Sequence, residues 1–306
     1  MNPSYPEFVM TPPRRVLKDT PVEVTQRTLG RTFRFLPRRR INELVLYVLG
    51  VGAERYGVSL YGFALMVTHY HLAARDVRGN LPAFVGYVNS ILARALNAYQ
   101  GEHDKVWSGS GYVSVVPQSP DDLLGKIVYG LANPAAAGLV NRIEDYPGLV
   151  ITPDQIGTAI TVRRPSFFFK DGGKMPESVT LQFEVPPEFS DLGLDGYRRL
   201  LWSQLRTREA RHRAARKHEG RGVIGAKRLR QAACGDRARS WEQWFTLRPA
   251  IAAKVRADRL AAIRGLRRFR AAYRDAWERW RTGERDVEFP AGTWWVVTYA
   301  GAAAVG

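Results

Sequence analysis

The hydrophobic pattern of the first 150 residues switches repeatedly between a period of two and a period near 3.6. Strands are expected at residues 22–27, 59–66, 69–74 and 112–116, and helices at about 36–52, 81–99 and 120–133. Ser119 is a good N-cap before Pro120, and Pro134 disfavours helical geometry in the residue before it. This order predicts an α+β fold, a ferredoxin-like antiparallel sheet with helices packed on one face.

The second half of the chain has a mainly helical pattern from about residue 190. A long helix is expected over Pro249–Thr282, before Gly283, and a turn and an aromatic strand over Phe289–Ala300. Its apolar stripe consists of Ile263, Leu266, Phe269, Tyr273, Trp277 and Trp280. Three segments are therefore expected, namely a proline-rich arm (1–20), a compact domain (21–150) and a basic, mainly helical extension (151–306).

Positive charge is concentrated in the extension. The chain has 46 Lys+Arg against 29 Asp+Glu, a net charge of +17, and residues 196–285 carry 26 basic and 8 acidic side chains. Such an excess suits a polyanion such as single-stranded or hairpin DNA, although a solvated helical face would look the same. The DNA-contacting candidates are Arg27, Lys126, Arg264, Arg267, Arg268 and Arg274. The aromatic residues Trp241, Trp244, Tyr273, Trp277 and Trp280 either stack on bases or fill a core.

Composition excludes several classes of protein. An apolar share of 45% excludes a wholly disordered chain, and the single cysteine, Cys234, excludes a disulfide framework. The first 16 residues lack the apolar run of a signal peptide, and the longest apolar stretches are too short to span a bilayer. We expect a cytoplasmic, nucleoid-associated monomer or homodimer with no membrane partner.

Two histidines stand two residues apart in one predicted strand. Alternate residues of a strand point to the same face, so His69 and His71 project together. Converging imidazoles are a natural pair of metal ligands, but two polar residues on a solvent-facing strand would show the same spacing.

A tyrosine lies on the polar side of the predicted helix at 120–133. Its aliphatic residues gather on one side of the helical wheel, whereas Tyr129 and Asn133 fall together roughly opposite, with Lys126 close by. Tyr129 is therefore free to point away from the core. A phenol needs a nearby cation to attack phosphate at neutral pH, and Asn133 offers a third metal ligand, or simply ends the helix before Pro134.

Two motifs resemble a known family. His69-Tyr70-His71 resembles the His-hydrophobic-His motif of the HUH nucleases. The segment Tyr129 to Val140 resembles the tyrosine helix of the REP-associated tyrosine transposases, whose pattern is Tyr, three residues, Asn-Pro, two residues, Ala-Gly-Leu-Val. The resemblance covers residues 14–150. The chain departs from the family at Val67-Thr68, where Pro-Asn is common, and at Tyr70, which is usually aliphatic.

The resemblance implies a transposase with an HUH nuclease core. His69, His71 and Asn133 would bind Mg²⁺ or Mn²⁺, and Tyr129 would attack single-stranded DNA at a hairpin-forming repeat or transposon end. The products would be a 5′-phosphotyrosine and a free 3′-hydroxyl, which supports strand transfer, DNA transposition and recombination. The alternative is a ferredoxin-like protein that binds single-stranded nucleic acid without catalysis.

Overall fold

The computed structural model describes residues 12–109, 111–238 and 249–305. Their contacts divide the chain into two compact units. One unit spans Asp19–Lys254, and the other combines Met1–Lys18 with Val255–Gly306. The two units are described separately below.

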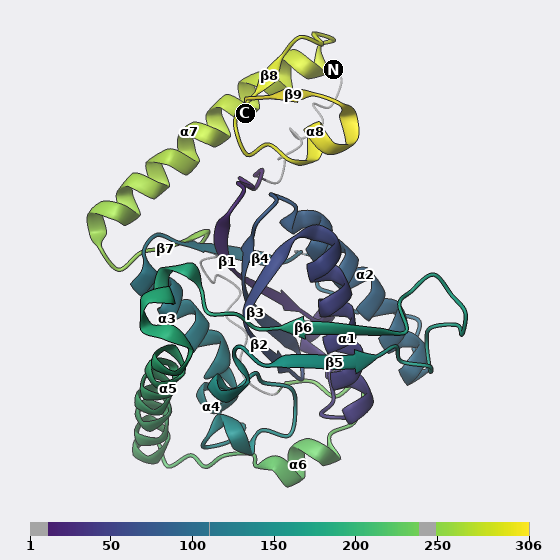
Figure 1. Cartoon of the computed structure of the whole chain (residues 1–306), viewed down its shortest axis with the longest axis vertical. Coiled ribbons are helices and arrows are strands. Elements are labelled where there is room, and N and C mark those ends of the chain that lie inside the picture. Colours follow the sequence, from purple (N-terminus) through teal and green to yellow (C-terminus); the bar gives the residue numbers. More distant parts are fainter. Residues whose placement is uncertain (1–11, 110, 239–248, 306) are drawn as a thin grey trace, which may run out of the picture. The chain divides into compact units, whose positions relative to one another are not determined.

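A five-stranded sheet forms the centre of the larger unit, in the order β2-β3-β1-β4-β7 (Figure 1). The strands are β1 (Thr20–Arg27), β2 (Val58–Met66), β3 (His69–Asp76), β4 (Val113–Pro117) and β7 (Ile251–Ala252). The β2–β3, β3–β1 and β1–β4 pairs are antiparallel, and β4–β7 is parallel. In the central pair, Thr25 lies opposite His71 and Arg27 opposite His69.

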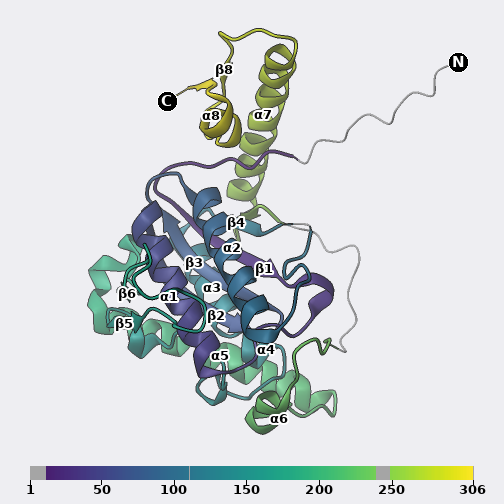
Figure 2. The same cartoon turned by 90° about the vertical axis from the view of Figure 1, so that its right-hand side faces the viewer.

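Helices cover both faces of this sheet (Figures 1 and 2). Helices α1 (Arg39–Tyr56) and α2 (Leu81–Gln100) pack on the face of Tyr70, whose hydroxyl donates to Asn89 Oδ1 on α2 at 2.9 Å. Helix α3 (Pro120–Leu131) lies on the opposite face, that of His71. The α+β class is confirmed. Helices pack on both faces of the sheet, whereas we expected them on one face only.

The rest of the larger unit packs around these layers. The hairpin of β5 (Ala159–Arg163) and β6 (Ser178–Gln182) contacts α1, where Gly50 leaves room for Val179 and Leu181. Helix α5 (Gly193–His218) contacts α3 and α4 (Asn133–Ala136), and the short α6 (Ala226–Gln231) follows it. Short 3-10 helices occupy Leu29–Arg31, Ile143–Asp145, Pro153–Gln155 and Pro187–Leu192.

The smaller unit is built on α7 (Arg256–Arg281). It also contains β8 (Glu288–Phe289), α8 (Trp295–Ala300) and β9 (Ala303–Ala304), which pairs in parallel with β8. Phe269, Tyr273, Val287, Phe289 and Val296 form its core, with Trp277 and Trp280 packed against it. Residues 12–18 have no helix or strand, and Val16 N–H donates to Gly292 C=O at 2.9 Å.

Two predicted elements near the end of the chain were wrong. The long helix does not start at Pro249, because residues 251–252 pair with the open edge of β4, where Val116 N–H donates to Ala250 C=O at 2.9 Å. The aromatic strand over Phe289–Ala300 is interrupted after Phe289, and its second half is the helix α8. With no partner strand in the described chain for Trp295–Ala300, a helix supplies the backbone hydrogen bonds and buries Val296.

Candidate active site

Strand β3 places the two histidines side by side on the face that α3 covers. The His69 and His71 ring centroids are 4.9 Å apart, with the ring planes nearly perpendicular at 82°. This is the shared orientation that the spacing of two predicted. The solvent-facing alternative is wrong for His71, which is only 4% exposed.

His71 is fixed in one orientation by β1. Its Nδ1 lies 2.7 Å from Glu23 Oε1 and 3.1 Å from Thr25 Oγ1, and both side chains of the His71–Glu23 pair are about 95% buried. A carboxylate at Nδ1 favours the tautomer that carries its proton there, so the lone pair is left on Nε2. The His71 Nε2 atom is buried and makes no hydrogen bond with any described residue.

A glycine on α3 lets this helix approach the histidine strand closely. A Cβ atom added to Gly130 would lie 3.1 Å from His71 Cβ, closer than most neighbours tolerate. Ile127 and Leu131 fill the core beneath α3, and Tyr129, which lies between them in the sequence, points outward. The Tyr129 ring is 45% exposed and stands edge-on to His71, with centroids 5.4 Å apart and planes at 90°. The nucleophile candidate therefore lies directly beside the histidine pair.

Asn133 completes this group from the break between two helices. It is the first residue of α4, one residue beyond the C-cap of α3 at Ala132. Its side chain makes a hydrogen bond with His69. On the other side, Thr68 Oγ1 lies 3.0 Å from His69 Nδ1. The two roles considered for Asn133 are thus compatible in position, since it follows the end of α3 and contacts a histidine.

Burial and charge set the protonation of these groups. Burial, the neighbouring His71 and the charge of Arg27 hold the pKa of His69 well below its usual value near 6.5, so this imidazole is neutral at pH 7. Burial and the Glu23 carboxylate raise the pKa of the Tyr129 phenol, against the opposing charges of Arg27 and Arg208. Burial also opposes ionisation of Glu23, but its hydrogen bonds with His71 and Thr25 help to lower the Glu23 pKa. The site thus contains a neutral imidazole, a protonated phenol and a carboxylate.

The donor set fits a divalent cation bound through nitrogen and an amide oxygen. His71 offers a buried, unpartnered Nε2 atom whose ring is anchored by a carboxylate, as metal-ligating histidines usually are. His69 is neutral and adjacent, and Asn133 adds an oxygen donor. Among the described residues, no group of three or more His, Cys, Asp and Glu side chains is placed to hold a metal ion. Any site here therefore depends on Asn133 or on a non-protein ligand for its third position.

The predicted DNA-contacting residues fall into two groups. Lys126 and Arg27 lie at the histidine site, where Lys126 Nζ is 5.4 Å from the Tyr129 ring centroid and the exposed Arg27 stands opposite His69 in the sheet register. The others are exposed on α7 in the smaller unit and form no ion pair with a described residue; they are Arg264, Arg267, Arg268 and Arg274.

The structure describes three of the five aromatic candidates of the extension. Tyr273 is buried in the core of the smaller unit, and Trp277 and Trp280 are partly buried against it, which favours the core-filling alternative. Trp241 and Trp244 lie outside the described residues. The exposed aromatic residues of this unit are instead Trp295 and Tyr299, which contact each other on α8.

Two neighbours of the site were not anticipated. Glu23 alternates with Val22 and Val24 along β1, so the sequence places it on the polar face of the strand and does not show that this face is also buried. Arg208 comes from α5, and its Cζ atom lies 5.9 Å from the Tyr129 ring centroid. No motif marks Arg208 among the many arginines of that helix.

Comparisons with known proteins find only distant structural similarity. No protein-family model matches the chain, and a search of curated proteins finds no significant match. One solved structure that is similar to part of the chain is a REP-associated tyrosine transposase bound to a REP hairpin, at 12% identity and a TM-score of 0.38, covering 44% of this chain and 78% of that one. Another is a candidate transposase from Deinococcus radiodurans R1, at 16% identity and a TM-score of 0.27, covering 35% of this chain and 85% of that one. Because both TM-scores are low, the site has to be interpreted from its own side chains.

A membrane-spanning helix was not expected. In the ranges that the structure describes, no helix combines the length and the apolar character needed to cross a bilayer.

Proposed function

We propose that this protein is a metal-dependent endonuclease and strand transferase of single-stranded DNA, of the tyrosine transposase kind, with Tyr129 as its nucleophile. The observation that carries the proposal is the buried Nε2 atom of His71, which has no hydrogen-bond partner among the described residues and belongs to a ring that lies beside the Tyr129 ring. An unsatisfied buried nitrogen costs about 1–3 kcal/mol of stability. A cation bound at that nitrogen would offset this cost and would stand next to the phenol.

The reaction follows from the position of Tyr129. Its Oη atom attacks the phosphorus of a DNA phosphodiester, the bond from phosphorus to the 3′ oxygen breaks, and a 5′-phosphotyrosine remains on the protein. The phenol loses one proton and the departing 3′ oxygen gains one, so the step is balanced. A 3′-hydroxyl attacking the phosphotyrosine reverses it, which gives strand joining at the same site.

The residues of the site have different roles in this proposed reaction. His69, His71 and Asn133 would hold Mg²⁺ or Mn²⁺, which when bound neutralises charge on the target phosphate and favours the phenolate. Imidazole ligands favour softer ions, so Mn²⁺ suits this donor set better than Mg²⁺. Burial and Glu23 raise the pKa of Tyr129, so its phenol is protonated at pH 7, and a bound cation would supply charge that favours the phenolate.

The basic surface of the extension supplies binding to the DNA backbone. The four exposed arginines of α7 present positive charge that no described carboxylate neutralises. Each phosphate contact contributes affinity through release of counterions, independently of sequence. Trp295 and Tyr299, which are 60% and 65% exposed, offer surfaces on which unpaired bases can stack. A substrate with single-stranded DNA beside a hairpin uses both kinds of contact.

A covalent-adduct assay tests this function. Labelled single-stranded hairpin DNA is incubated with the full chain and Mn²⁺, and the products are separated on a denaturing gel. The wild type should form a protein–DNA adduct and Tyr129→Phe should form none, because phenylalanine lacks the attacking oxygen. Tyr99→Phe makes the same chemical change on α2, which packs on the sheet face opposite the histidine pair, and should leave the adduct unchanged.

The same experiment distinguishes catalysis from simple binding. A chelator and His71→Ala should both abolish the adduct if a cation acts at this site. DNA retention that persists with chelator and with His69→Ala, and no adduct from the wild type, would instead identify a non-catalytic DNA-binding protein. An undiminished adduct with Tyr129→Phe would exclude Tyr129 as the nucleophile.

A further inference from the structure

One arginine of α5 faces the nucleophile and is not used by the fold. The Cζ atom of Arg208 lies 5.9 Å from the Tyr129 ring centroid, and its Nη1 atom is buried without a hydrogen-bond partner among the described residues. A buried guanidinium donor with no acceptor is unfavourable, because the group has lost its hydration without compensation. Burial accordingly lowers the pKa of Arg208. The guanidinium still carries its charge at pH 7.

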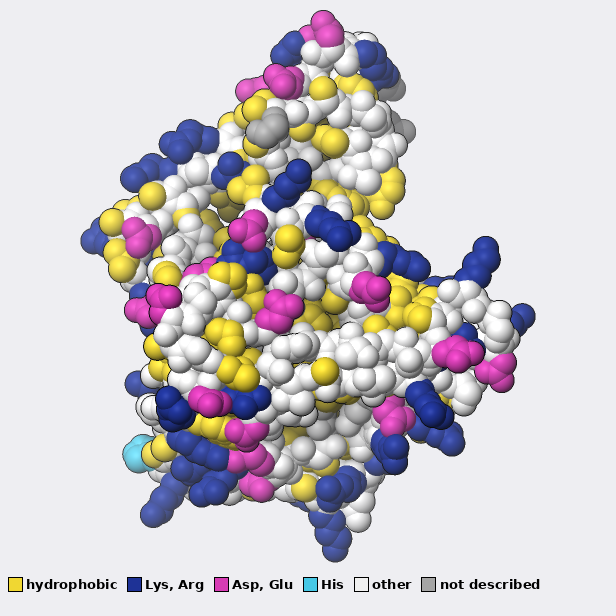
Figure 3. Space-filling view, in the orientation of Figure 1, with side chains coloured by type: hydrophobic (Ala, Val, Ile, Leu, Met, Phe, Trp, Pro, Cys, Tyr) yellow, Lys and Arg dark blue, Asp and Glu magenta, His cyan; other side chains and the backbone are white. Residues whose placement is uncertain are grey.

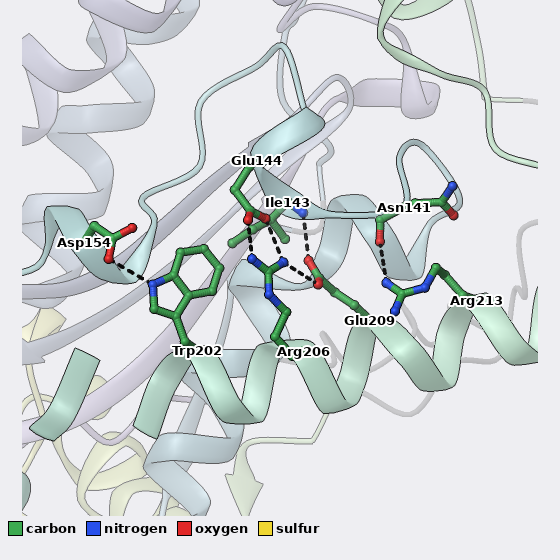
Figure 4. Close-up of polar contacts among 8 residues, drawn as sticks. All are labelled: Asn141, Ile143, Glu144, Asp154, Trp202, Arg206, Glu209 and Arg213. Carbon is green, nitrogen blue, oxygen red and sulfur yellow. Dashed lines mark hydrogen bonds and ion pairs between the residues drawn. The ribbon is translucent and has the colours of Figure 1, made fainter. Parts of the chain in front are cut away.

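Two neighbouring arginines of α5, Arg206 and Arg213, make structural contacts (Figure 4). Arg206 bonds Glu144 and the fully buried Glu209, and Glu209 in turn accepts from Ile143 N–H at 2.8 Å. Arg213 donates to the Asn141 carbonyl at 3.3 Å. These contacts, together with Trp202 Nε1 to Asp154 Oδ1 at 2.9 Å, anchor α5 to the segment 141–154.

Anchoring on one side of α5 directs Arg208 to the other. At about 100° per residue, Arg208 lies roughly 200° around the helix from Arg206 and about 140° from Arg213. Its side therefore faces α3, which α5 contacts. Because α5 is held by several bonds, the guanidinium is presented to Tyr129 from a fixed helix rather than from a loop.

Lys126 adds a second cation to the same phenol. Its Nζ lies 5.4 Å from the Tyr129 ring centroid, and it reaches the ring from one turn earlier on α3. Two cations from different helices next to one nucleophile form an electropositive position, and an arginine fork suits the paired oxygens of a phosphate. Figure 3 shows that Lys and Arg side chains also gather over the surface near α5, at the lower left of that view.

We propose that Arg208 binds the non-bridging oxygens of the phosphodiester that Tyr129 attacks, with Lys126 beside it. This inference rests on the proposed function, because it takes DNA as the ligand. The guanidinium would donate from Nη1, the atom that now lacks an acceptor, and would compensate negative charge as the Tyr129 Oη–P bond forms and the P–O3′ bond breaks. Residues beyond 150 then contribute directly to the catalytic position.

The test measures DNA binding separately from the covalent step. In the Tyr129→Phe background, affinity for a labelled single-stranded hairpin is measured over a series of salt concentrations. Adding Arg208→Ala should weaken binding by about tenfold or more, as expected for one lost charged hydrogen bond, and should reduce the salt slope by about 0.7. The matched control is Arg199→Ala, which removes the same charge from an exposed position about 13 Å along α5 and should change affinity less than about twofold.

Two further measurements separate this role from a structural one. Arg208→Ala should not lower the melting temperature, because Nη1 has no bond to lose, whereas Arg206→Ala should lower it by breaking the contacts with Glu144 and Glu209. In the wild-type background, Arg208→Lys should form adduct faster than Arg208→Ala, since it keeps the charge.

The outcomes keep the two proposals apart. If the wild type forms an adduct but Arg208→Ala binds and reacts like Arg199→Ala, the assignment of Arg208 is wrong while the proposed function stands. If no adduct forms but Arg208→Ala selectively weakens binding, the proposed phosphate contact of Arg208 is supported and the proposed catalytic function is wrong. If the protein binds no single-stranded DNA at any salt concentration, both are wrong.

Discussion

Replacing Glu23 with glutamine tests whether the buried carboxylate prepares His71 to bind a metal ion. The Glu23 side chain contacts His71 Nδ1 at 2.7 Å inside the protein, where both side chains are about 95% buried. Glutamine keeps the shape and one oxygen acceptor but removes the negative charge. A hydrogen bond to a charged group contributes about 1.5–3 kcal/mol, and a neutral one about 0.5–1.5 kcal/mol. The expected loss is therefore about 1–1.5 kcal/mol.

That energy corresponds to about a tenfold weaker affinity for Mn²⁺. Changes to residues that orient metal-ligating histidines typically reduce affinity by about 10–100-fold, which agrees with this magnitude. Titration calorimetry of Mn²⁺ into the full chain at pH 7 measures the effect without any catalytic assay. Thr25→Val removes the hydroxyl that lies 3.1 Å from His71 Nδ1 and donates to Glu23 Oε1 at 2.9 Å, but it keeps the carboxylate, so it should weaken Mn²⁺ binding less than Glu23→Gln does. The reasoning is refuted if Glu23→Gln binds Mn²⁺ as tightly as the wild type while His71→Ala does not bind it.

Two further expectations concern stability and the basic helix. The hydrogen bond from Arg206 lowers the pKa of Glu144, so its stabilisation is present above pH 4.5 and is lost as the pH falls through the lowered value. Urea unfolding should show Glu144→Gln less stable than wild type at pH 7 by up to about 1 kcal/mol, and this difference should disappear as the pH falls through that lowered pKa. The four exposed arginines of α7 are Arg264, Arg267, Arg268 and Arg274. Replacing all four with alanine should reduce the salt slope of single-stranded DNA binding by up to about 3 and leave Mn²⁺ affinity unchanged. An unaltered slope would show that α7 does not contact DNA.

Local patterns were sufficient to place the histidine pair and the tyrosine. Side chains alternate between the two faces of a strand, so His69 and His71 share a face once β3 forms. The helical wheel of α3 likewise places Tyr129 on the side away from Ile127 and Leu131. What the patterns lacked was the pairing of β1 with β3, which brings Glu23 to His71 across 48 residues. Register between strands is set by the whole sheet, and a single strand's alternation does not specify it.

The errors occurred where tertiary contacts override local preference. Residues 251–252 join the edge of β4 instead of starting a helix, because strand edges have unpaired backbone groups that another segment can satisfy. Trp295–Ala300 has the composition of a strand but forms α8, because isolated strand residues have no partner for their backbone. In both places the deciding interaction was non-local.

The arginines of α5 show why composition alone could not identify the function of each. Arg206 and Arg213 carry the same charge as Arg208 and lie within five residues of it, yet they bond to the segment 141–154 and hold the helix in place. Only the side of the helix separates the arginines that anchor it from the one beside Tyr129, and that side is fixed by where segment 141–154 runs. A count of basic residues predicts that a polyanion binds, whereas the unsatisfied Nη1 of Arg208 indicates where its phosphate would lie. The candidate catalytic position is therefore built from β3 and α3, which carry the two motifs, and from α5, which carries none.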